Sequence, residues 1–131
     1  MQETCNEYIE ISKKNFKIGN YELAYRQALR CQLEIENLFN VSSSEVQIRL
    51  LSLLYQSSKI ISDSSNLFRC KECAIREVRH KVLEYQTISE QSEYEQKTRQ
   101  AASFYLQKLE IDLKKMTKKS SNDDCQCIAI C

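Results

Sequence analysis

The longest regular helical pattern of the chain lies in residues 15–39, NFKIGNYELAYRQALRCQLEIENLF. Its small and apolar residues recur every three or four positions: Ala24, Ala28, Cys31, Ile35 and Leu38. Residues at this spacing share one face of an α-helix. Because the face begins with two alanines, it is narrow there and a second helix can approach closely. We therefore predict that this helix packs tightly against a neighbouring one.

The neighbour is predicted to be the segment directly upstream, residues 5–18. Gly19 and Asn20 join the two segments, and Gly19 is the only glycine in the chain. Glycine suits the left-handed conformation that commonly ends a helix, and asparagine is a good cap for the start of the next one. The turn residues and the apolar spacing thus predict the same structure, a hairpin of two antiparallel helices.

The residues around this turn also carry a family resemblance. They are Phe16, Gly19, Tyr21, Glu22, Ala24, Ala28 and Cys31, with Tyr8, Ile11 and Ser12 upstream. They resemble the middle of a tetratricopeptide repeat, in which a glycine, a tyrosine and a small residue recur at the inter-helix turn. The resemblance covers about one repeat, and Glu36 stands where that family commonly has a proline. It implies stacked helical hairpins that bind a partner protein.

Other interpretations of the same phrase remain open. The pattern Gly-Asn-Tyr-Glu-x-Ala suits any helical hairpin, and microtubule-interacting-and-transport domains, which are three-helix bundles, contain a similar phrase. Tetratricopeptide proteins that hold a C-terminal carboxylate use lysines and asparagines on the first helices of successive repeats. By this resemblance Lys13 and Lys17 face the binding groove, but Ile9 stands where an earlier basic residue is expected. A complete carboxylate clamp is therefore not predicted.

The composition is that of a soluble helical domain. A chain of 131 residues can bury a core without disulfides or metal. It has no proline, 42% hydrophobic residues and 28% charged residues. Nineteen lysines and arginines against 18 aspartates and glutamates leave a net charge of +1. This balance gives no global reason to expect nucleic acid or an acidic membrane as partner.

The seven cysteines raise the question of the redox compartment. Residues 1–17 contain no apolar run of signal-peptide length, and the longest apolar cluster, residues 50–55, is too short to span a bilayer. We expect a cytoplasmic or nuclear protein. In that compartment thiols stay reduced, so most of the cysteines are predicted to serve as small core residues.

The remaining periodicity predicts an all-α fold of about five antiparallel helices, either a tetratricopeptide-like α-solenoid fragment or a helical bundle. The expected helices span residues 5–18, 21–40, 45–62, 67 to between 85 and 91, and 92–118. Capping boxes mark the helix starts: Thr4 with Glu7, Ser44 with Gln47, and Ser92 with Glu95. The turn-forming run Asp-Ser-Ser-Asn at 63–66 is predicted to end the third helix. Because its apolar face is the broadest, this third helix should be the most buried.

A possible metal or redox site is the pair Cys70-x-x-Cys73, followed by His80. A structural zinc site needs a second ligand pair, and a thioredoxin-like site needs a preceding strand, and the helical part of the chain offers neither. Cys73 and His80 stand two turns apart on one helix, about 10 Å, too far for proton transfer. We expect no metal, no cofactor and no catalysis here, with Cys70 packed inward, Cys73 on the flank and His80 in solvent.

The C-terminal end forms a different kind of segment. We expect one all-helical domain in residues 1–119 and a flexible tail in residues 120–131 that contains Cys125, Cys127 and Cys131. The tail is not a prenylation motif, because Ile128 stands fourth from the end. S-acylation would combine with the lysines at 114–119 to give the two signals that membrane anchoring needs. The simpler interpretation is an unstructured end that follows lysines placed favourably at a helix C-terminus.

Taken together, these patterns predict a protein that is not an enzyme but a protein–protein interaction module, a tetratricopeptide-like adaptor or a small subunit of a larger complex. Its expected partner is a helix or an extended peptide, and not nucleic acid. The predicted partner-binding residues are Lys13, Lys17, Tyr25, Arg26 and Arg30, since tyrosine and arginine are enriched at binding hot spots. The alternatives are a membrane-proximal module tethered by an acylated tail, a three-helix trafficking module, and a small redox protein.

Overall fold

The chain folds into a stack of α-helices. The computed structural model describes residues 2–118, which form α1 (Gln2–Lys17), α2 (Tyr21–Phe39), α3 (Ser44–Phe68), α4 (Lys71–Glu90) and α5 (Gln96–Lys118). This described part contains no strand, so the predicted all-α fold is confirmed. Residue 1 and residues 119–131, with the expected tail and its cysteines, lie outside it.

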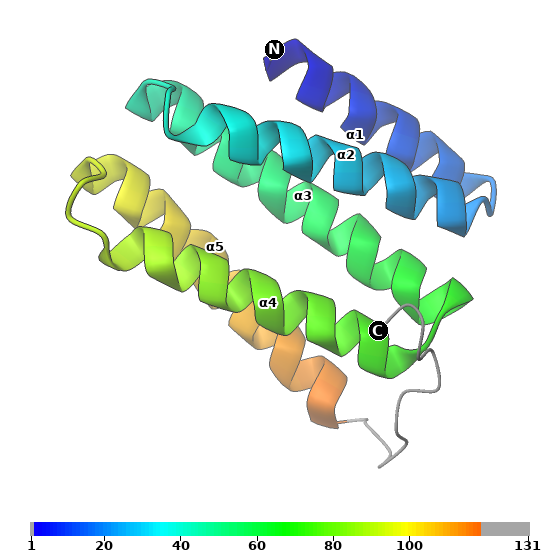
Figure 1. The fold of residues 1–131 in the computed structure, drawn as a ribbon. Coiled ribbons are helices and arrows are strands. Elements are labelled where there is room, and N and C mark those ends of the chain that lie inside the picture. Colours follow the sequence, from blue (N-terminus) through cyan, green and yellow to red (C-terminus); the bar gives the residue numbers. More distant parts are fainter. Residues whose placement is uncertain (1, 119–131) are drawn as a thin grey trace.

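The helices form two layers, and consecutive helices run antiparallel (Figure 1). Each helix contacts the next one along the chain, and α3 also contacts α1 and α5. One layer is therefore α1, α3 and α5. The other layer is α2 and α4, whose backbones do not approach each other closely within residues 2–118. Only α3 touches every other helix of the described part, which places it at the centre of the core.

The first hairpin matches the predicted geometry. Gly19 has a φ of +87°, in the left-handed region that favours glycine, and the backbone N–H of Asn20 closes the turn on the carbonyl of Asn15 at 2.9 Å. Asn20 occupies the N-cap of α2, but its side chain makes no capping hydrogen bond. Ala24 and Ala28 are fully buried, so α1 and α2 pack closely along the small-residue face, as predicted.

The core is centred on α3, which has more buried residues than any other helix between residues 2 and 118. Its largest fully buried side chains, Leu50, Leu51 and Ile61, are at most 1% exposed. The prediction that the third helix is the most buried is thereby confirmed. None of the helices in the described part carries an apolar stretch that could cross a lipid bilayer.

The predicted end of the third helix was wrong. Residues 63–66 do not form a turn, because α3 continues through them to Phe68. Ser64 and Ser65 are fully buried, and Phe68 packs against the ring of Tyr25 with centroids 5.4 Å apart. These tertiary contacts stabilise two further helical turns, and they outweigh the local preference of aspartate, serine and asparagine for turns.

The predicted helix starts also needed correction. The N-cap of α3 is Ser43, whose Oγ accepts a hydrogen bond from the backbone N–H of Val46 at 3.4 Å. Gln47 does not complete a capping box, because its side-chain amide donates to the carbonyl of Phe39 at 2.8 Å. From the first turn of α3, Gln47 thus provides a hydrogen-bond donor for a carbonyl group at the C-terminal end of α2.

At the two remaining boxes, the helices begin elsewhere. α1 starts at Gln2, ahead of the expected Thr4 cap. α5 starts at Gln96 and not after Ser92. The hydroxyl of Tyr94 donates to the side-chain oxygen of Asn40 at 2.6 Å, and its ring packs on Phe39. This contact with the end of α2 holds the backbone before Gln96 outside the helix.

Candidate partner-binding surface

The outward side of the α1, α3 and α5 layer forms a continuous polar surface, which we call the α1–α3–α5 face. The amine of Lys13 donates to the side-chain carbonyl oxygen of Gln56 at 3.0 Å, which joins α1 to α3. The hydroxyl of Tyr55 lies 3.4 Å from Oδ2 of Asp112, and the amine of Lys59 lies 3.8 Å from the same oxygen. These two contacts join α3 to α5. Side chains thus connect all three helices across one face.

An aromatic patch lies on the α5 side of this face. The amine of Lys108 lies 4.7 Å from the ring centroid of Phe104 and 5.5 Å from that of Tyr55, within the range of a cation–π contact. Phe104 is 53% exposed and Ile111 is 55% exposed. Burial and the nearby Asp112 carboxylate raise the pKa of Tyr55, so its hydroxyl stays protonated and remains a donor to Asp112.

A hollow of about 180 Å³ opens between α3 and α5. Val78 and Leu109, which are at most 3% exposed, lie at its floor together with the buried Ser58 and Ser62. Its rim is charged and consists of Lys59, Asp63, Asp112 and Lys115. Burial raises the pKa of Asp63, while the neighbouring Lys59 lowers it and Asp112 raises it. The hollow therefore combines a partly apolar floor with charges of both signs at its mouth.

A second hollow, of about 330 Å³, lies over α1 and α3. It is lined by Glu10, Lys13, Lys14, Phe16, Lys17 and Ile60. The aliphatic stems of the lysines, Phe16 and Ile60 make its lining mainly apolar, and the lysine amines bring positive charge to its edge. It extends the same face toward the N-terminal hairpin.

The five residues predicted to bind a partner lie in two groups. Lys13 and Lys17 lie together on the α1–α3–α5 face. Tyr25, Arg26 and Arg30 lie on α2, in the other layer. Tyr25 is half-buried and accepts a hydrogen bond from Arg69 at 2.8 Å, so it connects α2 to the segment between α3 and α4. Arg26 pairs with Glu22 at 3.0 Å on the same helix, and Arg30 is exposed.

Four residues of the face were not singled out from the sequence: Tyr55, Lys59, Phe104 and Lys108. Lys115 was considered only as part of the lysine cluster near the end of the last helix. Helical spacing is the sequence signal that could have identified these residues. Tyr55 and Lys59 are four residues apart on α3, and Phe104, Lys108 and Lys115 follow one another at intervals of four and seven residues on α5. Periodicity shows that such residues share a side of one helix. It does not show which helices lie next to one another.

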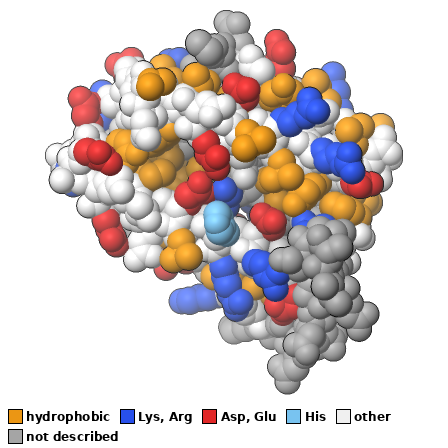
Figure 2. Space-filling view, in the orientation of Figure 1, with side chains coloured by type: hydrophobic (Ala, Val, Ile, Leu, Met, Phe, Trp, Pro, Cys, Tyr) orange, Lys and Arg blue, Asp and Glu red, His pale blue; other side chains and the backbone are white. Residues whose placement is uncertain are grey.

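The opposite surface, formed by α2 and α4, has a different character. Figure 2 shows acidic, basic and hydrophobic side chains interspersed on it, with His80 exposed near its middle. The prediction that His80 faces solvent is confirmed. No continuous single-sign patch is visible on this side.

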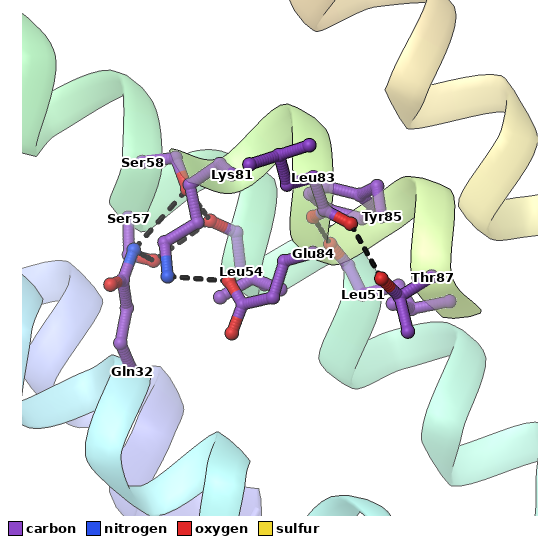
Figure 3. A network of polar contacts seen from close by, with 10 residues as sticks. All are labelled: Gln32, Leu51, Leu54, Ser57, Ser58, Lys81, Leu83, Glu84, Tyr85 and Thr87. Carbon is purple, nitrogen blue, oxygen red and sulfur yellow. Dashed lines mark hydrogen bonds and ion pairs between the residues drawn. The ribbon is translucent and has the colours of Figure 1, made fainter. Parts of the chain in front are cut away.

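A buried polar cluster lies where α2, α3 and α4 meet (Figure 3). The side-chain amide of Gln32 donates to Ser57 Oγ at 3.0 Å and to Ser58 Oγ at 3.2 Å, and both hydroxyls donate to the carbonyl of Leu54. Lys81 is 5% exposed, and its amine lies 2.6 Å from the carboxylate of Glu84. Buried polar groups are costly unless paired; the bonds of Gln32 join α2 to α3, and the hydroxyl of Tyr85 joins α4 to α3 by donating to the carbonyl of Leu51 at 2.6 Å.

The cysteine pair at the start of α4 is arranged differently from the prediction. Cys70 is the N-cap of α4, and its Sγ accepts a hydrogen bond from the N–H of Cys73 at 3.3 Å. The side chain packed inward is Cys73, which is 2% exposed, so the predicted roles were reversed. Here a sulfur atom accepts the capping hydrogen bond that a serine or aspartate oxygen usually accepts at an N-cap.

Two free cysteines lie in the core of the first hairpin. Cys5 and Cys31 are fully buried, one on α1 and one on α2. Burial raises the pKa of Cys31 to about 12, with a further contribution from Cys5. Burial also raises the pKa of Cys5, as does the nearby Glu34 carboxylate. Both are therefore protonated packing residues at neutral pH.

No group of three or more histidine, cysteine, aspartate or glutamate side chains in the described part of the chain is placed to hold a metal ion. Comparison with known proteins finds no matching family model, no matching curated protein and no matching solved structure.

Proposed function

We propose that this protein is a non-enzymatic interaction module, an adaptor or small subunit of a larger assembly, and that it binds its partner on the α1–α3–α5 face. The observation that carries the proposal is the continuity of this face. Side-chain contacts from Lys13 to Gln56 and from Tyr55 to Asp112 connect three helices into one surface. A partner helix or extended peptide that crosses all three would contact a single prearranged surface.

The order of helix contacts supports the same proposal. Alternate helices α1, α3 and α5 lie side by side, and α2 and α4 cover them from one side only. Stacked hairpins in α-solenoid proteins have this order, and such proteins bind partners on the surface of one layer. The tetratricopeptide resemblance of the first hairpin agrees with it. A partner site here would use Lys13 and Lys17 and would not need Tyr25, which is engaged with Arg69.

A second candidate is a three-helix trafficking module. The observation in its favour is that α1, α2 and α3 all contact one another, as the helices of a three-helix bundle do. In that case α4 and α5 would be an accessory hairpin, and partner binding would depend on residues of the first three helices alone.

The experiment is affinity purification from the native cells, with the parent and two charge-reversal variants as baits. Lys59→Glu with Lys115→Glu alters the α1–α3–α5 face, and Arg26→Glu with Arg30→Glu alters α2 by the same change in charge. We expect the first variant to lose its partners and the second to retain them. The reverse result would move the binding surface to α2. Loss in neither variant would contradict a charged partner surface on either layer.

A further inference from the structure

The α1–α3–α5 face concentrates positive charge. Around its two hollows and its aromatic patch stand the lysines at 13, 14, 17, 59, 108 and 115, against the carboxylates Glu10, Asp63 and Asp112. Six lysines against three carboxylates leave an excess of three positive charges, whereas the whole chain has a net charge of only +1. The rest of the molecule is therefore slightly acidic. A partner that is attracted to this face by charge should itself be acidic.

The face also offers a place for one apolar side chain. The hollow between α3 and α5 measures about 180 Å³, below the range of about 300 to 1,000 Å³ that is typical of small-molecule sites. Its floor is formed in part by Val78 and Leu109, and the amines of Lys59 and Lys115 flank its mouth. A pocket that receives one buried side chain inside a polar rim is typical of a protein–protein hot spot.

From these two features, and resting on the proposed function, we infer that the α1–α3–α5 face binds an acidic peptide segment with one bulky apolar side chain. That side chain occupies the hollow between α3 and α5, and the flanking aspartates and glutamates of the peptide contact Lys59, Lys115 and the lysines of α1. Packed helices lie about 8 to 10 Å apart, so the three helices span roughly 20 Å. An extended peptide of about six residues covers this span.

Nucleic acid and acidic membranes fit the face less well. The positive charges that line the two hollows are all lysines, without the arginines that recognise phosphates in a bidentate manner. Asp63 and Asp112 stand between Lys59 and Lys115 at the rim of the hollow, where they would repel a continuous row of phosphates. A peptide avoids this repulsion, because its acidic side chains can be spaced and its apolar side chain can lie over the hollow.

The test measures fluorescence anisotropy of a labelled peptide of twelve residues, in which aspartates and glutamates alternate with serines around a single central leucine. We expect saturable binding that weakens at least tenfold in the Lys59→Glu, Lys115→Glu variant. The Arg26→Glu, Arg30→Glu variant carries the same change in total charge and should stay within about twofold of the parent, since electrostatic attraction falls off beyond a Debye length of about 10 Å. Circular dichroism verifies that both variants remain helical.

Two further probes test the two parts of the inference separately. A peptide with serine in place of the leucine should bind about tenfold more weakly, because the hollow then receives no apolar side chain. Equal binding of both peptides would contradict the inference that an apolar side chain of the partner occupies the hollow between α3 and α5. The same assay is repeated with a twelve-nucleotide single-stranded DNA and with phosphatidylserine vesicles. If either binds as tightly as the peptide, the inference that the face recognises a peptide is wrong.

The result can be distinguished from failure of the proposed function. One outcome is that cellular partners depend on Lys59 and Lys115 while the acidic peptide fails to bind at millimolar concentration. In that case the α1–α3–α5 face is still the partner-binding surface, and the inference that its partner is an acidic peptide is wrong. If neither the partners nor the peptide depend on these lysines, both are wrong.

Discussion

The hydroxyl of Ser12 donates a hydrogen bond of 2.6 Å to the backbone carbonyl of Ala24, which joins α1 to α2 inside the first hairpin. Ser12 is fully buried. A buried donor with a good partner typically contributes about 1 kcal/mol to stability. Ser12→Ala should therefore lower the free energy of unfolding by about this amount, measured by urea denaturation.

Ser64 provides the matched control for that variant. It is also fully buried, but its Oγ has no hydrogen-bond partner among the described residues. Replacing a buried hydroxyl that lacks a partner removes a desolvation penalty, so Ser64→Ala should leave stability unchanged or raise it. Equal destabilisation by the two substitutions would mean that the bond from Ser12 to Ala24 contributes nothing.

The central position of α3 predicts a large effect of truncating one of its core side chains. Leu50 is fully buried, and Leu50→Ala should cost about 2 to 5 kcal/mol, against a total stability of about 5 to 15 kcal/mol for a domain of this kind. Leu83 is 62% exposed on α4, and Leu83→Ala should change stability by less than about 0.5 kcal/mol. Thermal and urea unfolding measure the stability of both variants. Similar stabilities would mean that the core is assigned wrongly.

Asp63 gives the stability of the protein a specific dependence on pH. Burial raises its pKa in the folded state, so the folded protein holds this proton more tightly than the unfolded chain, whose value is about 3.8. The contribution of this group to stability is therefore present below pH 3.8 and is lost as pH rises through the folded pKa. Asp63→Asn should melt at a higher temperature than the parent at pH 7, and the difference should narrow toward pH 4. If the difference in melting temperature instead widened on acidification, the pKa of Asp63 would not be raised in the folded state.

The buried thiols of the first hairpin should resist chemical modification. Cys5 and Cys31 are fully buried, and burial raises the pKa of Cys31 from 9.0 to about 12, so almost no thiolate exists at pH 8. We expect iodoacetamide to leave both unlabelled in the native protein and to label both in guanidinium, as read by peptide mass spectrometry. Rapid native labelling would show that the α1–α2 interface opens readily.

Removal of the C-terminal segment tests the alternative of membrane tethering. The core described above lies within residues 2–118. A chain that ends at residue 119 should therefore keep its helical circular dichroism signal and its partners. If truncation abolishes partner binding or membrane localisation while the fold persists, the cysteines at 125, 127 and 131 carry the function, and acylation becomes the leading account.

The sequence predicted local features of the fold well and their mutual arrangement less well. The α1–α2 hairpin was predictable, because Gly19 and the buried Ala24 and Ala28 act within a few residues of each other. The continuation of α3 through residues 63–66 was not, since the burial of Ser64 and Ser65 and the packing of Phe68 on Tyr25 override the local turn preference. The same limit applies to the surface. Lys13 and Lys17 were identified through the tetratricopeptide resemblance of the first hairpin, whereas Lys59, Lys108 and Lys115 lie near one another only because α3 and α5 are adjacent.

The stacking order of the helices bears on how the chain acquires its fold. No helix in the described part contacts another that is more than two places away along the chain. Folding of chains dominated by such local contacts is fast, typically in microseconds to milliseconds, because little loop-closure entropy is lost before contacts form. Since α1, α2 and α3 contact one another, the first 68 residues contain a mutually packed unit. During synthesis this unit can assemble on its own at the ribosome, and its α3 then serves as the template on which α4 and α5 are added as they emerge.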